Sequence, residues 1–516
     1  MASTASPSRM ILVNLLGLQG LAAVSIVRNV LLVPIYLQYV GADLYGAWIA
    51  AVGMAAFVQL ADLGIPRMLV QRTAALHGAS DRFGVGRTTA SGLISLALLT
   101  LAMLGLLLPL AGWMTSGFGF AGPRAAMITT ASRLALLDGA LTLMAYGEGG
   151  VLLGLQRPTT AMLPLILGQL VGIAVTLVLL GRGAGLTALP LGMLTGTSLA
   201  LLITTVALVQ AVRAEVPAGA FRCHGVTLRE LLTSSTLLTF SRLSRVVALQ
   251  APGVLAATLL SPAAAAVMDV SRKSSLLIAD VVGKLTMSFH PELARLAGTN
   301  DDKSFRRTGQ IMLRATYLLG AIGVGGVLAF NQEFVRLWTG SRLFGGEPLT
   351  ALFCASALLQ LMGVATFFVL LSGGAERIIT RAALFEAVLQ ILLAVALGRA
   401  LGLVGIALGT VVAAAAGLAV QAPFLLRLIR TPMPWHSELR GIARGIVTGL
   451  LPIALGAAFL MVLRPGGWVR LGLQASGYVL VSTLVLITVD DEAHGWLTGW
   501  VRPTFETFCR TDRLGP

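Results

Sequence analysis

The sequence predicts an all-α polytopic membrane protein with about 14 transmembrane helices. Of its 516 residues, 56% are hydrophobic, the mean hydropathy is +0.87, and only 11% are charged. A soluble domain carries roughly 25% charged residues. Fourteen apolar segments, most of them near the roughly 20 residues that cross a bilayer, also follow one another along the chain. A soluble fold cannot bury this much apolar surface, so the bilayer is the expected solvent.

The apolar segments give an ordered set of expected spans. Spans 1–6 would form an N-terminal lobe at 1–215, and spans 7–12 a C-terminal lobe at 216–430. The last two spans would form an extra pair with a cytoplasmic tail at 431–516. The expected limits are 10–40, 44–70, 88–113, 125–153, 158–181, 186–212, 230–260, 263–290, 307–330, 348–373, 378–398, 402–427, 440–463 and 468–489.

An internal repeat suggests that the first twelve spans form two equivalent halves. Three short motifs recur in the same order at offsets of 217 to 220 residues, and about six spans separate the copies. Both halves would then have the same orientation, which makes a parallel repeat about an axis along the membrane normal. The paired segments are 78–81 with 298–301, 156–157 with 376–377, and 185–192 with 402–409.

The net charge of +15 comes from 34 Arg and three Lys set against 22 acids. Nucleic-acid binding is an unsuitable explanation, because no loop is long enough to form a binding module. The basic residues instead gather in alternate loops, with clusters at 71–87 and 295–307. Basic loops of membrane proteins lie on the cytoplasmic side, so both termini are expected there.

Charged side chains inside the spans mark candidate binding residues, because they are costly in a membrane and usually face a cavity. Arg28, Arg242 and Arg245 have no acid three or four residues away, and Arg272 follows Asp269 by three residues on the same span. Guanidinium groups bind phosphate through bidentate, charge-assisted hydrogen bonds, so these four are expected to hold a pyrophosphate. Further polar or coupling candidates are Asn14, Gln59, Asp62, Arg133, Asp138, Asp269, Lys273 and Asp280.

A simpler interpretation exists for part of this set. Asp269 with Lys273, and Asp280 with Lys284, are spaced four residues apart and would neutralise each other on one helix. No metal site is expected either, because the three Cys and five His show no ligand spacing. A phosphate-loop motif is also missing from the sequence, so neither a cofactor nor an enzymatic activity is predicted.

Residues 32–48 read LVPIYLQYVGADLYGAW, and Ala61-Asp62-Leu63-Gly64-Ile65 precedes a basic loop. Both stretches resemble the first helices of bacterial O-antigen and exopolysaccharide flippases. These flippases belong to the multidrug/oligosaccharidyl-lipid/polysaccharide exporter superfamily and are related to lipid II flippases, which also carry Arg in span 1. The resemblance implies two lobes around a cavity lined by spans 1, 2, 7 and 8.

The leading hypothesis is a flippase of the bacterial cytoplasmic membrane. It would move a polyprenyl-pyrophosphate-linked oligosaccharide to the outer leaflet by alternating access, for cell-surface polysaccharide biosynthesis. Its partners would be membrane lipids and the polysaccharide polymerase or glycosyltransferase machinery. One alternative is an ion- or proton-coupled exporter of small molecules that uses Asp62, Asp138 or Asp269. A second is a non-transporting membrane scaffold for glycosyltransferases.

The basic loops allow a direct test of the orientation. A Ser80→Cys variant is expected to resist membrane-impermeant thiol reagents in intact cells and to react after the cytoplasmic membrane is permeabilised. Labelling of this variant from the periplasm would reverse the predicted topology.

Overall fold

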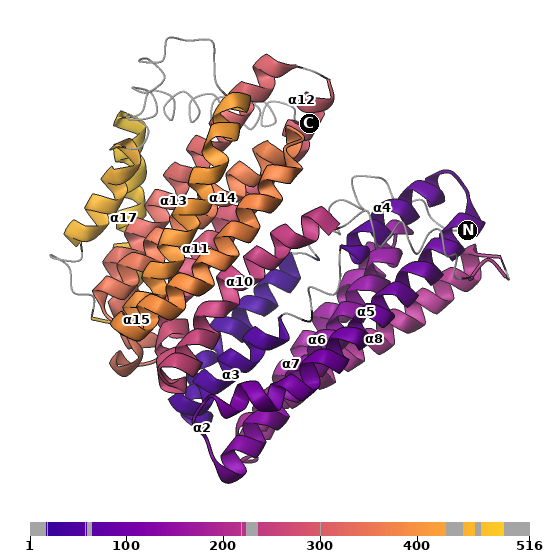
Figure 1. The fold of residues 1–516 in the computed structure, drawn as a ribbon, viewed down its shortest axis with the longest axis horizontal. Helices are drawn as coiled ribbons and strands as arrows, with labels where there is room; N and C mark the ends of the chain where they lie inside the picture. Colours follow the sequence, from indigo (N-terminus) through magenta and orange to yellow (C-terminus); the bar gives the residue numbers. More distant parts are fainter. Residues whose placement is uncertain are drawn as a thin grey trace, which may run out of the picture. The chain divides into compact units, whose positions relative to one another are not determined.

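A computed structural model describes residues 17, 19–56, 58, 64–217, 219–222, 236–299, 301–429, 447–459 and 466–489, with the side chains of 114 and 236–245 left aside. Regular structure in these ranges is entirely helical (Figure 1). The elements are η1 (Val27–Leu31), α2 (Val33–Val40), α3 (Ala42–Ala55), α4 (Ile65–Gly78), α5 (Arg82–Ser116), α6 (Gly122–Gly154), α7 (Pro158–Gly181), η3 (Gly185–Thr187), α8 (Ala188–Glu215), α10 (Thr236–Leu259), α11 (Pro262–Met287), α12 (His290–Gly298), α13 (Asp302–Trp338), η4 (Ser341–Leu343), α14 (Glu347–Ser372), α15 (Glu376–Ile429) and α17 (Trp468–Val489).

These helices confirm the predicted polytopic all-α fold. Nine described helices are long and apolar enough to cross a membrane, by length and composition. One of them, α15, is two helices joined at Gly402, where the backbone turns to φ +64°. Three shorter apolar helices, at Ala42–Ala55, Val246–Leu259 and Val447–Phe459, and the charged helix α11 match the remaining predicted spans.

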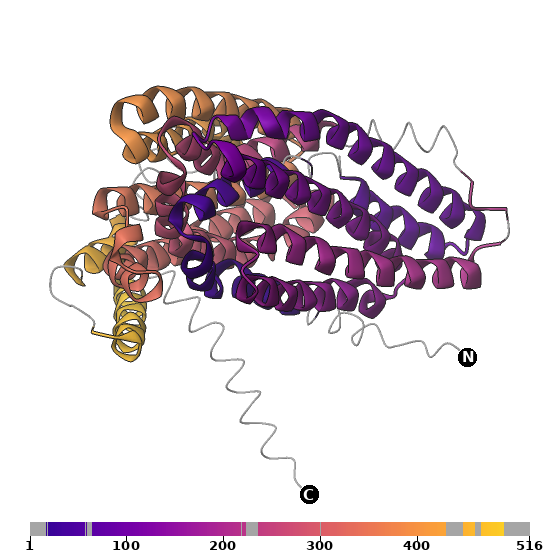
Figure 2. The ribbon, with the colours of Figure 1, turned by 90° about the horizontal axis from the view of Figure 1, so that it is seen from below.

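The chain divides into two compact units. Unit 1 comprises Met1–Asp269 and Ala383–Gly409, and unit 2 comprises Val270–Ala382 and Thr410–Pro516. In unit 1, α6 packs against α3, α4, α5, α7 and α8, and Figures 1 and 2 show α5 to α8 side by side. The lobe boundaries at 215 and 430 come from the sequence repeat and stay a prediction.

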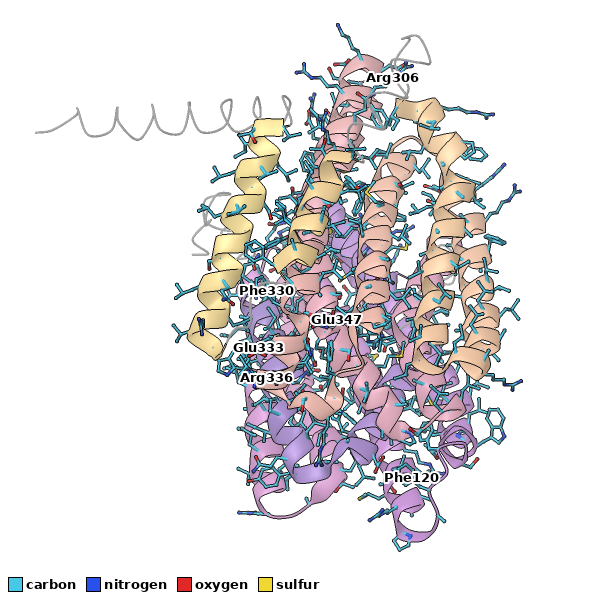
Figure 3. All side chains as sticks on the ribbon, turned by 90° about the vertical axis from the view of Figure 1, so that its left-hand side faces the viewer. Phe120, Arg306, Phe330, Glu333, Arg336 and Glu347 are labelled. Atoms are coloured by element: carbon cyan, nitrogen blue, oxygen red, sulfur yellow. The ribbon has the colours of Figure 1, made fainter. Side chains whose placement is uncertain are left out.

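In unit 2, α13 is the common packing partner of α12, α14 and α17. Tyr478 of α17 is buried against Phe330 of α13, which Figure 3 labels. The Tyr478 hydroxyl lies 3.0 Å from the carbonyl oxygen of Ile322 and 2.9 Å from that of Pro452. One side chain therefore joins α17, α13 and the helix at 447–459.

The turns predicted to repeat have matching backbone geometry. Asp81 Oδ1 accepts from the Gly84 amide at the start of α5, and Asp301 Oδ1 accepts from the Ser304 amide at the start of α13. The third pair also matches, because Gly185 and Gly402 both have positive φ. The middle pair is displaced: the turn at Gln156 matches the one at 374, two residues earlier than the sequence pairing.

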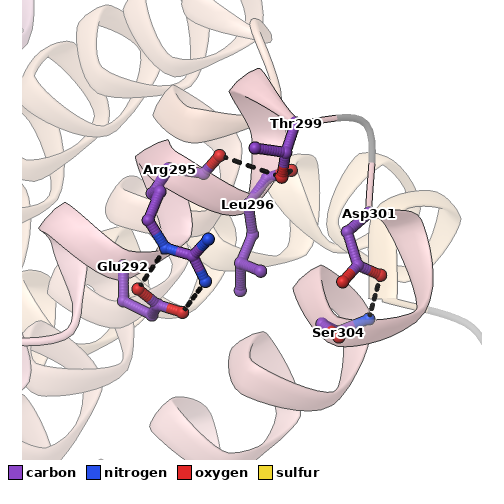
Figure 4. Close-up of polar contacts among 6 residues, drawn as sticks. All are labelled: Glu292, Arg295, Leu296, Thr299, Asp301 and Ser304. Carbon is purple, nitrogen blue, oxygen red and sulfur yellow. Dashed lines mark hydrogen bonds and ion pairs between the residues drawn. The ribbon is translucent and has the colours of Figure 1, made fainter.

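Figure 4 shows how the basic loop before α13 is held. Arg295 donates two hydrogen bonds to the exposed carboxylate of Glu292, at 2.8 and 2.6 Å. These bonds lower the pKa of Glu292 and raise that of Arg295. The Ser304 bonds likewise lower the pKa of Asp301. The Glu292 and Asp301 contributions to stability are therefore present above their ordinary pKa values and are lost as the pH falls through the lowered ones.

Helix α3 approaches α11 at Gly46, within the motif that suggested the family resemblance. A Cβ added at Gly46 would overlap the backbone carbonyl of Pro262, which has no freedom to move aside as a side chain has. Small residues allow such close helix contacts in membranes, where the hydrophobic effect does not drive helices together. Gly46 therefore sets the separation of α3 from the start of α11.

This contact predicts a loss of stability for Gly46→Ala. We expect a decrease of about 1–3 kcal/mol in the free energy of unfolding, because overpacking a tight contact forces the backbones apart. Thermal unfolding of the purified protein in one detergent measures it. Gly105→Ala in α5 is the matched control, since no neighbouring atom lies near its added methyl group. Equal stability of the two variants would contradict the proposed contact.

Candidate functional site

The structure describes the side chains of seven of the twelve predicted site residues. Asn14, Gln59 and Asp62 lie outside the described residues. Arg242 and Arg245 lie on α10, in the part of that helix whose side chains are left aside. The described members are Arg28, Arg133, Asp138 and Asp269 in unit 1, and Arg272, Lys273 and Asp280 in unit 2.

Arg28 lies on an irregular turn of the first span. Val27–Leu31 is a π-helical turn, in which the Leu32 amide donates to the Val27 carbonyl at 3.1 Å. Pro34 follows at the start of α2. Proline has no amide hydrogen, and its ring collides with the carbonyl four residues earlier, so a regular α-helix cannot continue through this point. Single π-turns of this kind are frequent at functional sites.

The guanidinium group of Arg28 is half-buried and surrounded by polar groups of unit 1. It interacts electrostatically with Tyr36 of α2 and with Asp138 and Tyr146 of α6. Among the described residues it makes no hydrogen bond to another side chain. Its donors are thus available to an anion, while a nearby carboxylate offsets part of its charge.

Asp138 is a buried acid within electrostatic range of this arginine. Its side chain is only 6% exposed and lies close to the Thr197 side chain of α8. Its Oδ1 atom has no hydrogen-bond partner in the described part of the chain. Asp138 lies 110 residues after Arg28 in the sequence, so helical spacing within a single span does not reveal this partner.

Polar contacts occur at three levels along the parallel helices α6 and α8. We call this line of contacts the α6–α8 seam. Asp138 meets Thr197 at the first level, and Glu148 meets Thr205 at the second, about ten residues further along α6. At the end of both helices, Arg157 donates to Glu215 at 2.7 Å, and His77 Nδ1 lies 3.4 Å from the same carboxylate. Neither Glu148 nor the threonines are among the site residues predicted from the sequence.

The charges of α11 have separate environments. Asp269 is buried and accepts a hydrogen bond from the hydroxyl of Tyr45, a residue of the family-like motif, at 3.1 Å. Asp280 and Lys284 form an ion pair at 2.6 Å on an exposed face, as the simpler interpretation required. Their charges neutralise each other in this structure. Arg272 is buried, and Lys273 is half-buried.

Arg133 is exposed, in contrast to the neighbouring candidate Asp138. It precedes Asp138 by five residues on α6, which places the two on different faces of the helix. The structure therefore does not group Arg133 with Asp138 and Arg28.

Unit 2 contains a polar network centred on Asn331 of α13. Its amide donates to the Ser271 carbonyl at 3.0 Å and the Thr350 hydroxyl at 3.1 Å, and it accepts from Ser274 at 2.6 Å. These bonds join α11, α13 and α14 and satisfy the amide, which indicates a structural role. Across the described ranges, no three His, Cys, Asp or Glu side chains gather as metal ligands would.

Comparison with known proteins gives a structural match without a sequence match. No family model matches the chain, and no curated protein does. An inward-facing multidrug resistance MATE family transporter of the MOP superfamily is 18% identical, with a TM-score of 0.63 over 77% of this chain and 96% of that one.

Two other solved structures share the same architecture. The lipid II flippase MurJ in an inward closed conformation is 14% identical, with a TM-score of 0.56 over 90% of this chain and 97% of that one. A MOP superfamily transporter from Pyrococcus furiosus, whose binding pocket has reverse polarity, is 17% identical, with a TM-score of 0.57 over 83% and 98%. The chain has the fold of MOP superfamily transporters.

Proposed function

We propose that this protein is a flippase that moves a polyprenyl-pyrophosphate-linked oligosaccharide to the outer leaflet of a bacterial cytoplasmic membrane. The proposal rests on the environment of Arg28. Its guanidinium group is half-buried in an apolar span and makes no hydrogen bond to a described side chain. A cation held at this depth requires a partner, and a phosphate diester offers acceptors that match its planar donors.

The extent of the structural matches supports a lipid-linked substrate. The multidrug transporter aligns over 96% of its own length but covers 77% of this chain. The Pyrococcus protein aligns over 98% of its length and covers 83% of this chain. The lipid II flippase matches 90% of this chain. More of this chain therefore has a counterpart in a flippase of a lipid-linked molecule than in these two transporters.

A small-molecule exporter is the second candidate function. Asp138 favours it, because a buried carboxyl group with one oxygen unpartnered in the described residues suits a coupling ion or proton. Uptake of a fluorescent cationic dye into inverted vesicles tests this candidate. Dye transport that is lost in Asp138→Asn, without any binding of polyprenyl pyrophosphate to the protein, would replace the flippase proposal.

The flippase proposal predicts a specific effect of Arg28. In lipid nanodiscs, Arg28→Ala is expected to bind polyprenyl pyrophosphate at least tenfold more weakly, since a charge-assisted hydrogen bond contributes about 1.5–3 kcal/mol. Arg28→Lys should restore only part of the affinity, because an ammonium group lacks the bidentate fork. Binding titrations with the fluorescently labelled lipid measure both effects.

The control is Arg182→Ala at the exposed end of α7 in the same unit, which removes the same charge. This variant is expected to bind as the wild type does. An equal loss of affinity in both variants would show that net charge alone causes the effect. Full affinity of Arg28→Ala would disprove the role of Arg28. Loss of the folded protein on size-exclusion chromatography would instead support the scaffold alternative, in which these charges hold helices together.

A further inference from the structure

Glu148 is a buried carboxyl group that the proposed pyrophosphate site does not use. Its side chain is 7% exposed, on α6 and within the membrane-spanning part of unit 1. Both of its carboxyl oxygens lie 2.9 Å from the hydroxyl oxygen of Thr205 on α8. Both carboxyl oxygens thus lie beside a single hydroxyl group. The proton in this contact can come either from Thr205 or from Glu148.

The Thr205 hydroxyl has one proton but lies within hydrogen-bond distance of more than one acceptor. Thr205 Oγ1 also lies 2.8 Å from the backbone carbonyl of Leu201, one turn earlier in α8. A hydroxyl group carries one proton and two acceptor lone pairs. When Thr205 donates to Leu201, as helical threonines commonly do, the contact with Glu148 needs a proton on the carboxyl group.

Other threonines of α8 also bond to the backbone carbonyl four residues earlier. Thr195 donates to the Leu191 carbonyl at 2.7 Å, and Thr204 bonds to the carbonyl of Ala200 in the same way. Three hydroxyl groups of one helix thus bond to the carbonyl four residues earlier. With the Thr205 proton used in this bond, the Glu148 contact is that of a neutral carboxylic acid donating to a hydroxyl oxygen.

Among the described residues, no counter-charge acts on Glu148. Helices α3, α4, α5, α7 and α8 pack around α6, yet Thr205 is the single side chain among the described residues that acts on this carboxyl group. An ionised carboxylate without a cation or several donors is very costly in an apolar environment. The lack of a counter-charge among the described residues and the hydrogen-bond geometry independently indicate a protonated carboxyl group.

We propose that Glu148 is a proton-binding site of unit 1, distinct from the Arg28 group. In the conformation described, an O–H bond on Glu148 holds the proton, and the carboxyl donates it to Thr205. Its source is water at the end of the α6–α8 seam, since Glu148 lies six residues before Gly154, about 9 Å along the helix. Release returns the proton to water and leaves a carboxylate. The proposal concerns the bound ion and holds whichever solute is carried.

Infrared spectroscopy of the full-length protein in lipid nanodiscs tests the site without measuring transport. At pH 7, the spectrum of the wild type minus that of Glu148→Gln is expected to contain the C=O stretch of a protonated carboxyl group. In D₂O this band should shift within the measurement, because the proton exchanges with water. Thr205→Val should keep the band at an altered frequency, whereas Thr205→Ser should leave it unchanged.

Glu333→Gln is the matched control. Glu333 forms an ion pair with Arg336 at the end of α13, where Figure 3 labels both residues. Its difference spectrum should contain carboxylate bands and no protonated carboxyl band. A carboxylate signal for Glu148 at pH 7 would overturn the proposal, as would a carboxyl band that Glu148→Gln leaves in place. A band that does not shift in D₂O would show a fixed proton and overturn the exchange with water.

Discussion

Helices α7 and α8 meet backbone to backbone at Gly168 and Gly196, where a Cβ on either residue would overlap the carbonyl oxygen of the other. The same occurs one turn further, at Gly172 and Gly192. Interhelical contact in a membrane depends on such close packing, because lipid tails solvate apolar side chains as well as another helix does. The glycines fix the position of α8, and α8 carries the threonines that meet α6. The polar groups of unit 1 depend on this contact.

Helix α6 holds two buried carboxyl groups in different environments. Asp138 lies within electrostatic range of Arg28, whereas Glu148 has a threonine and no cation among its described neighbours. Different surroundings give chemically identical groups different protonation behaviour, which is how proteins assign separate tasks to paired acids. The proposed anion site and the proposed proton site are thus connected by one rigid helix, about ten residues apart.

The sequence predicted the fold well because hydrophobic length is a strong signal in membranes. The predicted span at 263–290 corresponds to α11. This helix contains five charged residues, but most of its other residues are apolar. The turn capped by Asp81 and its counterpart at Asp301 were also recognised, because the capping residue itself repeats. The middle turn was paired two residues late: its left-handed residue is Gln156 in one copy and Gly374 in the other, so no identical residue marks the register.

Site prediction was less complete because it used spacing within single helices. That approach identified the pair of Asp280 and Lys284, which the structure contains. It overlooked the electrostatic partner of Arg28 and the environment of Glu148, since both arise between helices that are far apart in sequence. The place of Arg133 among the cavity candidates stays a prediction, because its exposure alone does not show whether it faces a cavity or lipid. Interhelical register, set here by glycine contacts, is the information that composition and periodicity lack.

Tyr478 fastens α17 and the helix at 447–459 to α13 through two backbone carbonyls. Gly325 faces the same hydroxyl group, so a larger residue there would displace it. Since sliding α17 along α13 would leave the Tyr478 hydroxyl without an acceptor in an apolar environment, we expect the three helices to move as one body. A spin label or fluorophore attached to α17 therefore reports the displacement of unit 2 itself. The exposed face of this helix offers attachment points, such as Leu473 and Leu480, outside the packed interior.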